Sequence, residues 1–335
     1  MSLISVIIPL YNSETTIQET IQSVLSQTFS DLELIIINDG STDSSLEIVS
    51  QIQDPRLQVF SYPNGGLAVS RNRGLSHASS EYISFIDADD LWTPDKLELQ
   101  LKALTKNPQA AVAYSWSNCI DESSQFLRPG CHITANGNVF AQLLLVNFLE
   151  NGSNPLIRQQ ALSEVGGFDE SLPAAQDWDM WLRLAAKFHF VAIPKPQILY
   201  RVSAQSMSTN VLQLERASLQ VMERALAQAS ESCDDLKKPS RANLYKYLTF
   251  KALEGSSVPE RGLTAARFLW QSLINDPSLL KTRVIWKVLL KIVLVTFLPQ
   301  QQLAAMKQLS DIRALLVQIK TPLPSDLMSS GSEVG

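Results

Sequence analysis

Residues 82–97 read YISFIDADDLWTPDKL, in which a short apolar run ends in Asp87, Asp89 and Asp90. Carboxylates this close repel one another, and the apolar run before them is typical of a buried strand. Three interpretations are open: a solvated turn with capping aspartates, a metal site made only of protein ligands, or a Mg²⁺ or Mn²⁺ site completed by a substrate's phosphate oxygens. The buried strand favours the third, and the run lacks the spaced acidic positions of an EF-hand.

The first 120 residues alternate short apolar segments with segments of helical periodicity. The predicted strands are ISVIIPL (4–10), LELIIIN (32–38), LQVFSY (57–62), YISFID (82–87) and AAVAYSW (110–116). Helices are predicted between them, at 13–27, 44–52, 67–78 and 94–107. Uninterrupted apolar strands joined by helices indicate an α/β, doubly wound, mainly parallel sheet with helices on both faces and ligands at the carboxyl ends of its strands. Asn12, Asp39 and the aspartate cluster all follow such strands.

The chain changes character after about residue 210, where helical patterns replace the alternation. We predict a catalytic domain over 1–210, with a nucleotide-binding half over 1–120 and an acceptor half over 121–210. A C-terminal helical region is expected over 211–320. The polar, small residues 321–335 are expected to form a disordered tail.

The net charge of −5 is distributed unevenly. Residues 1–210 hold 12 basic and 22 acidic residues, whereas residues 211–320 hold 16 and 9. A basic region on an acidic protein suggests a role at an anionic surface. The three cysteines are scattered without metal-ligand or disulfide spacing, and no signal peptide is evident, so a cytoplasmic location is expected.

The run 284–298 is nearly all apolar and is interrupted only by Lys287 and Lys291. It is short for a membrane span, which needs about 20 apolar residues. One interpretation is an interfacial helix with Trp286 and the lysines at the headgroup level, which would place the protein peripherally on the inner face of the cytoplasmic membrane. The other is a buried core helix of the C-terminal bundle.

Six motifs follow one another at ordinary intervals: SVIIPLYNSE, IINDGSTDSS, NGGLAVSRNRG, FIDADDLW, GGFDE and QDWDMWLRL. Together they closely resemble glycosyltransferase family 2 over roughly residues 1–205. The resemblance implies the GT-A fold and an inverting hexosyltransferase. Such an enzyme moves a sugar from a nucleotide diphosphate sugar, here expected to be a UDP-sugar, to an acceptor hydroxyl. It also implies a role in cell-envelope or exopolysaccharide synthesis, with a lipid-linked saccharide as one candidate acceptor and no nucleic-acid partner.

The resemblance assigns the donor site to residues at the strand ends. It places Pro9, Tyr11 and Glu14 at the nucleotide and gives Asp39 the role of accepting from the uracil ring NH. Strand-end packing remains an alternative for Pro9 and Tyr11, and a plain turn role for Asp39. In NGGLAVSRNRG the glycines permit close backbone approach before a helix N-terminus, and Arg71 matches the arginine near the diphosphate.

The resemblance also divides the aspartates by role. Asp87 faces the ribose and metal, and Asp89 is the direct ligand of a divalent cation, Mn²⁺ or Mg²⁺. The cation offsets charge on the departing diphosphate. Asp90 is expected to cap the next turn. Asp177 matches the catalytic base that takes the acceptor hydroxyl's proton.

Neighbouring residues are read as structural. Arg73 is expected to be a solvated or structural charge, and Asp179 to pair with Arg183 at i+4. Trp178 and Trp181 either line the acceptor site or pack the helix.

Two departures leave alternatives open. Many relatives carry Glu-Asp where this chain has Gln176-Asp177, and a histidine where it has Ser203. A degenerate, non-catalytic scaffold or carbohydrate-binding module is therefore the main alternative. A sugar nucleotidyltransferase is less favoured, because YNSETT lacks a Gly-rich phosphate loop.

Overall fold

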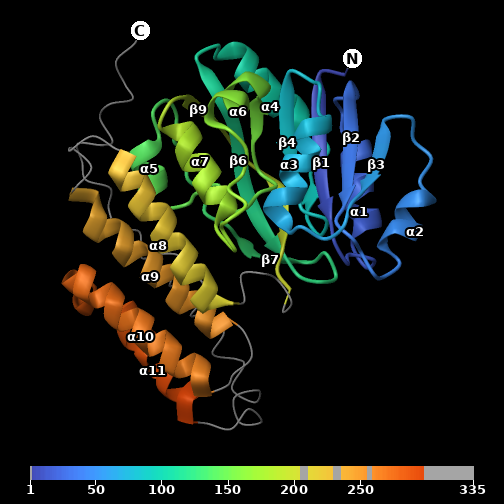
Figure 1. Cartoon of the computed structure of the whole chain (residues 1–335). Coiled ribbons are helices and arrows are strands. Elements are labelled where there is room, and N and C mark those ends of the chain that lie inside the picture. Colours follow the sequence, from blue (N-terminus) through green and yellow to red (C-terminus); the bar gives the residue numbers. More distant parts are fainter. Residues whose placement is uncertain (1, 204–209, 229–234, 255–258, 298–335) are drawn as a thin grey trace. The chain divides into compact units, whose positions relative to one another are not determined.

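The computed structural model describes residues 2–203, 210–228, 235–254 and 259–297. The chain divides into two compact units (Figure 1). One comprises residues 1–143 and 147–203, and the other comprises 144–146 and the chain from 204 onward. Each unit is considered by itself. The tail predicted at 321–335 lies outside the described residues.

Nine strands of the described chain form one sheet in the first unit. They are β1 (Ile4–Leu10), β2 (Leu32–Asn38), β3 (Leu57–Ser61), β4 (Tyr82–Phe85), β5 (Leu91–Trp92), β6 (Ala110–Ile120), β7 (Phe126–Pro129), β8 (Leu156–Arg158) and β9 (His189–Arg201). The sheet order is β3-β2-β1-β4-β8-β6-β9-β5, and β7 pairs with β6. The blue strands β1 to β3 lie side by side in Figure 1.

Residues 1–85 contribute most of the parallel part of the sheet. β1 pairs in parallel with both β2 and β4, and β2 with β3. Because β1 is covered on both faces, all seven of its residues are buried. The later strands add antiparallel pairs through β5, β7 and β8, whereas the long strand β9 runs parallel to β6. Irregular register near Pro196 accommodates the prolines that interrupt β9.

Helices of the first unit cover the sheet. They are α1 (Ile17–Leu25), α2 (Ser45–Ser50), α3 (Leu67–His77), α4 (Lys96–Lys106), α5 (Phe140–Leu145, its last two residues assigned to the second unit), α6 (Gln159–Val165) and α7 (Gln176–Ala185). Ile17, Ile21 and Val24 recur at helical spacing on α1 and join a core with alternate residues of β1. Ile7 points to the opposite face, against Gly74 in α3. The predicted covering of both faces is confirmed.

The second unit is helical in the part that the structure describes. It contains α8 (Val211–Gln228), α9 (Lys237–Glu254), α10 (Pro259–Asn275), the 3₁₀ helix η3 (Pro277–Lys281) and α11 (Arg283–Phe297). An ion pair joins α8 to α10, with the exposed Arg267 donating to the buried Glu215 at 2.6 and 2.9 Å. Within the described ranges, no helix combines the length and the apolar character needed to cross a membrane.

Candidate functional site

The carboxyl ends of β1, β2 and β4 meet at one edge of the sheet and carry most of the predicted site. Pro9 lies near the end of β1 and Tyr11 directly follows it, Asp39 follows β2, and the turn 86–90 follows β4. Pro9 is buried, and its Cα pairs with that of Ile37, whereas Tyr11 is exposed. This edge therefore presents an aromatic ring to solvent beside two acidic turns.

Asp90 does not cap the next turn, so that prediction was wrong. Its carboxylate is fully buried, accepts from the Ser153 hydroxyl at 2.5 Å and accepts from the Arg201 backbone N–H at 2.9 Å. Ser153 Oγ in turn accepts from the Asp87 backbone N–H at 2.9 Å. Burial and the neighbouring charges of Asp89 and Asp87 raise the pKa of Asp90 well above its usual value. Asp90 thus fixes the turn from inside.

Arg201 fixes the same turn from β9. Its buried guanidinium donates to the Asp89 carbonyl at 2.7 Å, to the Asp121 carbonyl at 3.0 Å and to Glu19 at 2.9 Å. Ser153 and Arg201 are positioning residues that sequence reasoning missed. Arg201 lies in the segment YRVS (200–203), but nothing in that segment indicates its partners. Ser203 follows two residues later, just before residues outside the described chain.

Arg71 connects the aspartate turn to the acceptor half. Its side chain is buried, donates to Asp87 Oδ1 at 2.6 Å and lies over the Phe168 ring at 5.2 Å. Gly152 makes room for it, because a Cβ there would lie 2.2 Å from the Arg71 guanidinium. The Arg71 Nε has no hydrogen-bond partner among the described residues.

Asp177 lies within electrostatic reach of this pair. Burial raises the pKa of Asp177, the Arg71 charge opposes that rise, and the Asp87 charge adds to it. The structure therefore brings Asp177 close to Arg71 and Asp87, although about 90 residues separate Asp177 from Asp87 in sequence. Its carboxylate accepts from the Trp178 backbone N–H at 2.8 Å and remains partly exposed.

The start of α7 sets the position of Asp177. Ala175 adopts a left-handed conformation, with φ of 57°, immediately before the helix. This conformation is strained for a residue with a Cβ, and such strain is typical of functional sites. Gln176 is turned away, donating to the Leu172 carbonyl at 2.7 Å.

The residues of α7 that follow Asp177 have packing roles. Arg183 donates to Asp179 at 2.8 Å, which confirms the predicted i+4 pair. Trp178 and Trp181 are both buried, and Trp178 donates to the Leu143 carbonyl. In this structure both tryptophans pack the helix.

Asp39 is buried and holds the loop that begins α3. Its carboxylate accepts from the backbone N–H groups of Gly65 at 2.9 Å and Gly66 at 2.8 Å, and from Arg73 at 2.8 Å. Arg73 also lies over the Tyr62 ring at 4.6 Å, so its charge is structural. A carboxylate has about four acceptor positions, so Asp39 retains capacity for a ligand N–H.

Glu14 joins the first two loops of this edge. The Glu14 backbone N–H donates to Asp43 at 3.0 Å, and the Glu14 carboxylate accepts from the Ser44 backbone N–H at 2.9 Å. Backbone and side-chain hydrogen bonds to Ser45 and Glu14 lower the pKa of Asp43 despite some burial. These loops therefore hold each other in place beside Tyr11.

Asp89 is better suited to serve as a single protein ligand of a divalent cation than to be part of a site made only of protein ligands. Burial, followed by the Asp87 charge, raises the pKa of Asp89 to about 6. No side chain of the described residues donates to its carboxylate. Across the same residues, no group of three or more His, Cys, Asp or Glu side chains could hold a metal ion. Two neighbouring carboxylates, of which only Asp87 is bonded to a cationic side chain, suit a cation whose remaining ligands arrive with a diphosphate.

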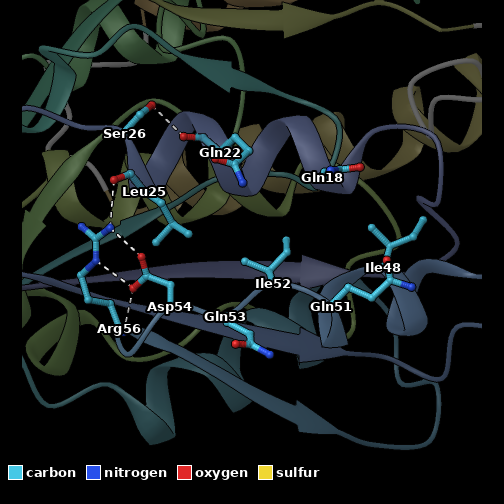
Figure 2. Close-up of a pocket in the computed structure, with 10 residues that line it drawn as sticks. All are labelled: Gln18, Gln22, Leu25, Ser26, Ile48, Gln51, Ile52, Gln53, Asp54 and Arg56. Atoms are coloured by element: carbon cyan, nitrogen blue, oxygen red, sulfur yellow. Dashed lines mark hydrogen bonds and ion pairs between the residues drawn. The ribbon is translucent and has the colours of Figure 1, made fainter.

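A separate groove of about 580 Å³ lies between α1 and α2 (Figure 2). Its floor contains Leu25, Ile48 and Ile52, and its rim carries Gln18, Gln22, Gln51 and Gln53. The charges in it are mutually paired, since Arg56 donates to both carboxylate oxygens of Asp54. None of the predicted site residues lines it.

Residues 5–252 match the family described as "Glycosyltransferase like family 2". The chain therefore belongs to this glycosyltransferase family, and the family and enzyme class expected from the motifs are confirmed.

Curated proteins similar to this chain are consistent with the family assignment. The chain is 32% identical over 215 residues to a chondroitin synthase of Pasteurella multocida. The aligned region covers 64% of this chain and 22% of that protein. The chain spans about a third or less of the length of the curated relatives it matches first.

Two solved structures show the fold. Staphylococcus aureus TarS in complex with UDP-GlcNAc has a TM-score of 0.54 and 17% identity, covering 84% of this chain and 92% of that one. The mannosyltransferase PcManGT from Pyrobaculum calidifontis, in complex with GDP-Man and Mn²⁺, has a TM-score of 0.57 and 16% identity. The superposed region covers 96% of this chain and 88% of the mannosyltransferase chain. The predicted GT-A fold class is confirmed.

Proposed function

We propose that this protein is a metal-dependent inverting glycosyltransferase that moves a hexose from a nucleotide diphosphate sugar, a UDP-sugar, to an acceptor hydroxyl. One observation carries the proposal: the buried Arg71 links Asp87 on the donor side to Asp177 on the acceptor side. A cation, an anion-binding arginine and a base are thus available around one reaction centre.

The nucleotide end rests on the first two loops. Pro9 and the exposed Tyr11 would form the wall for the base, with Glu14 holding the loop beneath it. Asp39 would accept from the uracil ring NH with the acceptor capacity that the glycine loop leaves free. Two structures of similar fold, TarS in complex with UDP-GlcNAc and PcManGT in complex with GDP-Man, support a nucleotide-sugar donor.

The diphosphate would bind between Arg71 and the aspartate turn. Asp89 would hold Mn²⁺ or Mg²⁺, and Asp87 would face both the ribose and the cation while keeping its bond to Arg71. When bound, the cation would neutralise charge that develops on the departing diphosphate. Ser153 and Arg201 would keep both carboxylates in register before the donor arrives.

Asp177 would act as the base. Its raised pKa makes the carboxylate a stronger proton acceptor than a solvated aspartate. The carboxylate oxygen would take the proton of the acceptor hydroxyl as that oxygen attacks the anomeric carbon, opposite the leaving diphosphate. The sugar then changes configuration, and Asp177 carries the proton away.

A cell-envelope or exopolysaccharide setting follows from the same proposal. The acceptor would be a saccharide linked to a lipid, met in the cytoplasm at the inner face of the membrane. The basic composition of residues 211–320 supports this setting.

The test is a panel of nucleotide sugars incubated with the full chain, with and without Mn²⁺, scoring donor hydrolysis and binding. Metal-stimulated turnover of at least one UDP-sugar is expected in the wild type, and not in Asp177→Asn. Saccharide binding without turnover for any donor would overturn the proposal and favour a non-catalytic carbohydrate-binding module.

A further inference from the structure

Large apolar side chains lie exposed on the last two described helices. Seven residues of α10 and α11 expose half or more of their surface: Leu263, Trp270, Ile274, Trp286, Leu290, Val293 and Phe297. On α11 the opposite side is buried, through Ile285, Val288, Ile292 and Val295. The helix is therefore neither wholly core nor wholly solvated, since its inner face packs and its outer face is apolar and uncovered.

The seven residues form one face across both helices. With 3.6 residues per turn, Trp286, Leu290, Val293 and Phe297 fall on one stripe of α11, and Leu263, Trp270 and Ile274 on one stripe of α10. Gly262, near the start of α10, approaches Thr296, near the end of α11, so closely that a Cβ would lie 2.2 Å from the threonine hydroxyl. The helices are therefore antiparallel neighbours at this point (Figure 1).

On each helix, the stripe is rotated about a quarter turn around the helix axis from the residue that makes this contact. When each helix is viewed along its own chain direction, the rotation from contact to stripe has the same sense on both helices. Because the chains run in opposite directions, both stripes then point to the same side. We call the seven residues together the α10–α11 face. It carries two tryptophans, and contiguous exposed apolar patches of this kind mark interaction surfaces.

Positive charge borders this face. Residues 277–297 contain four basic residues and no acidic residue. Lys281, Arg283 and Lys287 are exposed, and helical spacing places Arg283 and Lys287 beside the α11 stripe, on the side away from α10. The partner must therefore accept both apolar side chains and several cations.

Charge distinguishes the possible occupants. A second copy of the chain would bring the same four cations and no acidic side chain from this segment to meet them. Residues 298–335 of the same chain hold three basic and three acidic residues, so they would bring no net negative charge to this border. An anionic lipid surface offers both hydrocarbon and negative charge. Tryptophan and lysine are also the residues that anchor helices at headgroup depth.

We propose that the α10–α11 face docks the protein on the surface of an anionic phospholipid bilayer, with α10 and α11 lying in the plane of the interface. The proposal deepens the membrane setting given under Proposed function and does not depend on the transfer chemistry. Each cation near such a surface strengthens binding by about fivefold, screened beyond about 8–10 Å at ordinary salt. Binding should therefore be reversible and weaken with salt, while the apolar contribution persists.

The experiment is co-sedimentation of the full chain with vesicles of phosphatidylcholine alone, or of phosphatidylcholine and phosphatidylglycerol in equal parts, at low and high salt. We expect binding to the anionic vesicles that falls with salt without vanishing. The pair Trp270→Ser and Trp286→Ser should lower partitioning by about tenfold or more. The pair Arg283→Gln and Lys287→Gln should lower it by about tenfold at low salt and little at high salt.

Matched controls replace similar residues elsewhere. Phe126→Ser removes an exposed aromatic side chain from β7, and Lys102→Gln with Lys106→Gln removes two exposed cations at the same spacing from α4. Both controls should bind vesicles like the wild type. The charge pair lies on the surface and keeps the test valid if the tryptophan pair proves unstable in a melting curve.

Three results would overturn the proposal: no binding of the unaltered protein to anionic vesicles at low salt, equal loss in the variants and their controls, or a wild-type dimer that the tryptophan pair dissociates without any vesicle binding. UDP binding measured in parallel separates the two proposals. Loss of UDP binding while vesicle binding remains intact would count against the proposed donor site alone.

Discussion

The carboxyl edge of the sheet and the α10–α11 face differ in which kind of side chain each buries and which it exposes. At the edge, the buried arginines are tied to carboxylate partners, as Arg71 is to Asp87 and Arg201 is to Glu19. On the α10–α11 face, large apolar groups are exposed, and no hydrogen bond within the described residues fixes them. Buried charge is costly unless it is paired, and exposed apolar surface is costly unless something covers it.

The difference teaches what each region is suited to do. A reaction needs groups held within a fraction of an ångström, which the buried network supplies. A bilayer surface is fluid and needs only area and charge, which an unconstrained face supplies. Substitutions at the edge should therefore change chemistry or stability, whereas substitutions on the face should change location alone.

The largest effect is expected at Asp177. Asp177→Asn should retain donor binding and lose transfer by about 10²–10⁴-fold, because the amide keeps the shape but cannot accept the acceptor's proton. Donor binding is measured by calorimetry and transfer by UDP release. Asp179→Asn, two residues along α7, is the matched control and should retain transfer because Asp179 pairs with Arg183. More than about a tenth of the wild-type rate in Asp177→Asn would assign the base elsewhere.

The next effect concerns Asp89. Asp89→Ala should abolish Mn²⁺-dependent binding of UDP, because Asp89 is the proposed direct ligand. In the wild type, protonation competes with the cation: with a pKa of about 6, Asp89 is ionised above that pH and protonated below it. Mn²⁺ affinity should thus be flat above pH 6 and fall by about tenfold per unit below it.

The control for this titration is Mn²⁺ binding to UDP without protein over the same pH range, because the terminal phosphate of UDP also binds protons near this pH. Any fall seen without protein belongs to the nucleotide. Undiminished Mn²⁺-stimulated binding in Asp89→Ala would remove Asp89 from the metal site.

A stability effect is expected at Arg201. Arg201→Lys should lower the free energy of unfolding by about 3 kcal/mol, because an ammonium cannot reproduce a buried, forked set of bonds to Asp89, Asp121 and Glu19. Denaturant unfolding measures the loss. Arg56→Lys, which alters a partly exposed pair with Asp54, should cost about 1 kcal/mol or less. Equal losses in the two variants would mean that Arg201 does not anchor the turn.

The fold was predictable because its signals are local. Uninterrupted apolar runs such as ISVIIPL are buried on both faces, and the periodicity of α1 matches its buried residues. The short antiparallel strands β5 and β8 were not predicted, since they have only two and three residues. Such short strands depend on neighbours distant in sequence.

The site was predictable only in part. Motif order brought Arg71, Asp87 and Asp177 into one hypothesis, and the structure places them together. The buried network was not visible in sequence. Lys96, in the first turn of α4, is fully buried, donates to the Ser84 hydroxyl at 2.7 Å and has its Nζ 3.6 Å from the Trp92 ring centre. Burial alone holds the pKa of Lys96 well below its usual value.

A smaller effect is expected at Asp39. Asp39→Ala should weaken UDP binding at least about tenfold more than binding of inorganic diphosphate, because it removes a charged acceptor and frees the glycine loop. Calorimetry with both ligands measures the difference. Arg73→Gln is the control, since it removes one partner of Asp39 and leaves its bonds to Gly65 and Gly66. Equal losses for UDP and diphosphate would point to a misfolded edge rather than to base recognition.

The smallest effect is expected on the α10–α11 face, where neighbouring residues provide the sharpest contrast. Trp286 is 62% exposed and Ile285 is 1% exposed, although they are adjacent on α11. Trp286→Ser should change the free energy of unfolding by less than about 0.5 kcal/mol, because most of the side chain contacts solvent. Ile285→Ser should cost about 3 kcal/mol or more, since it leaves a cavity and buries a hydroxyl. Urea unfolding of the two variants, read beside their vesicle binding, gives opposite outcomes for the two substitutions. The first should release the protein from lipid with its stability intact, and the second should unfold the helical unit. If Trp286→Ser instead destabilises the protein as much as Ile285→Ser, then the tryptophan packs against protein, and the face is not free to meet a membrane.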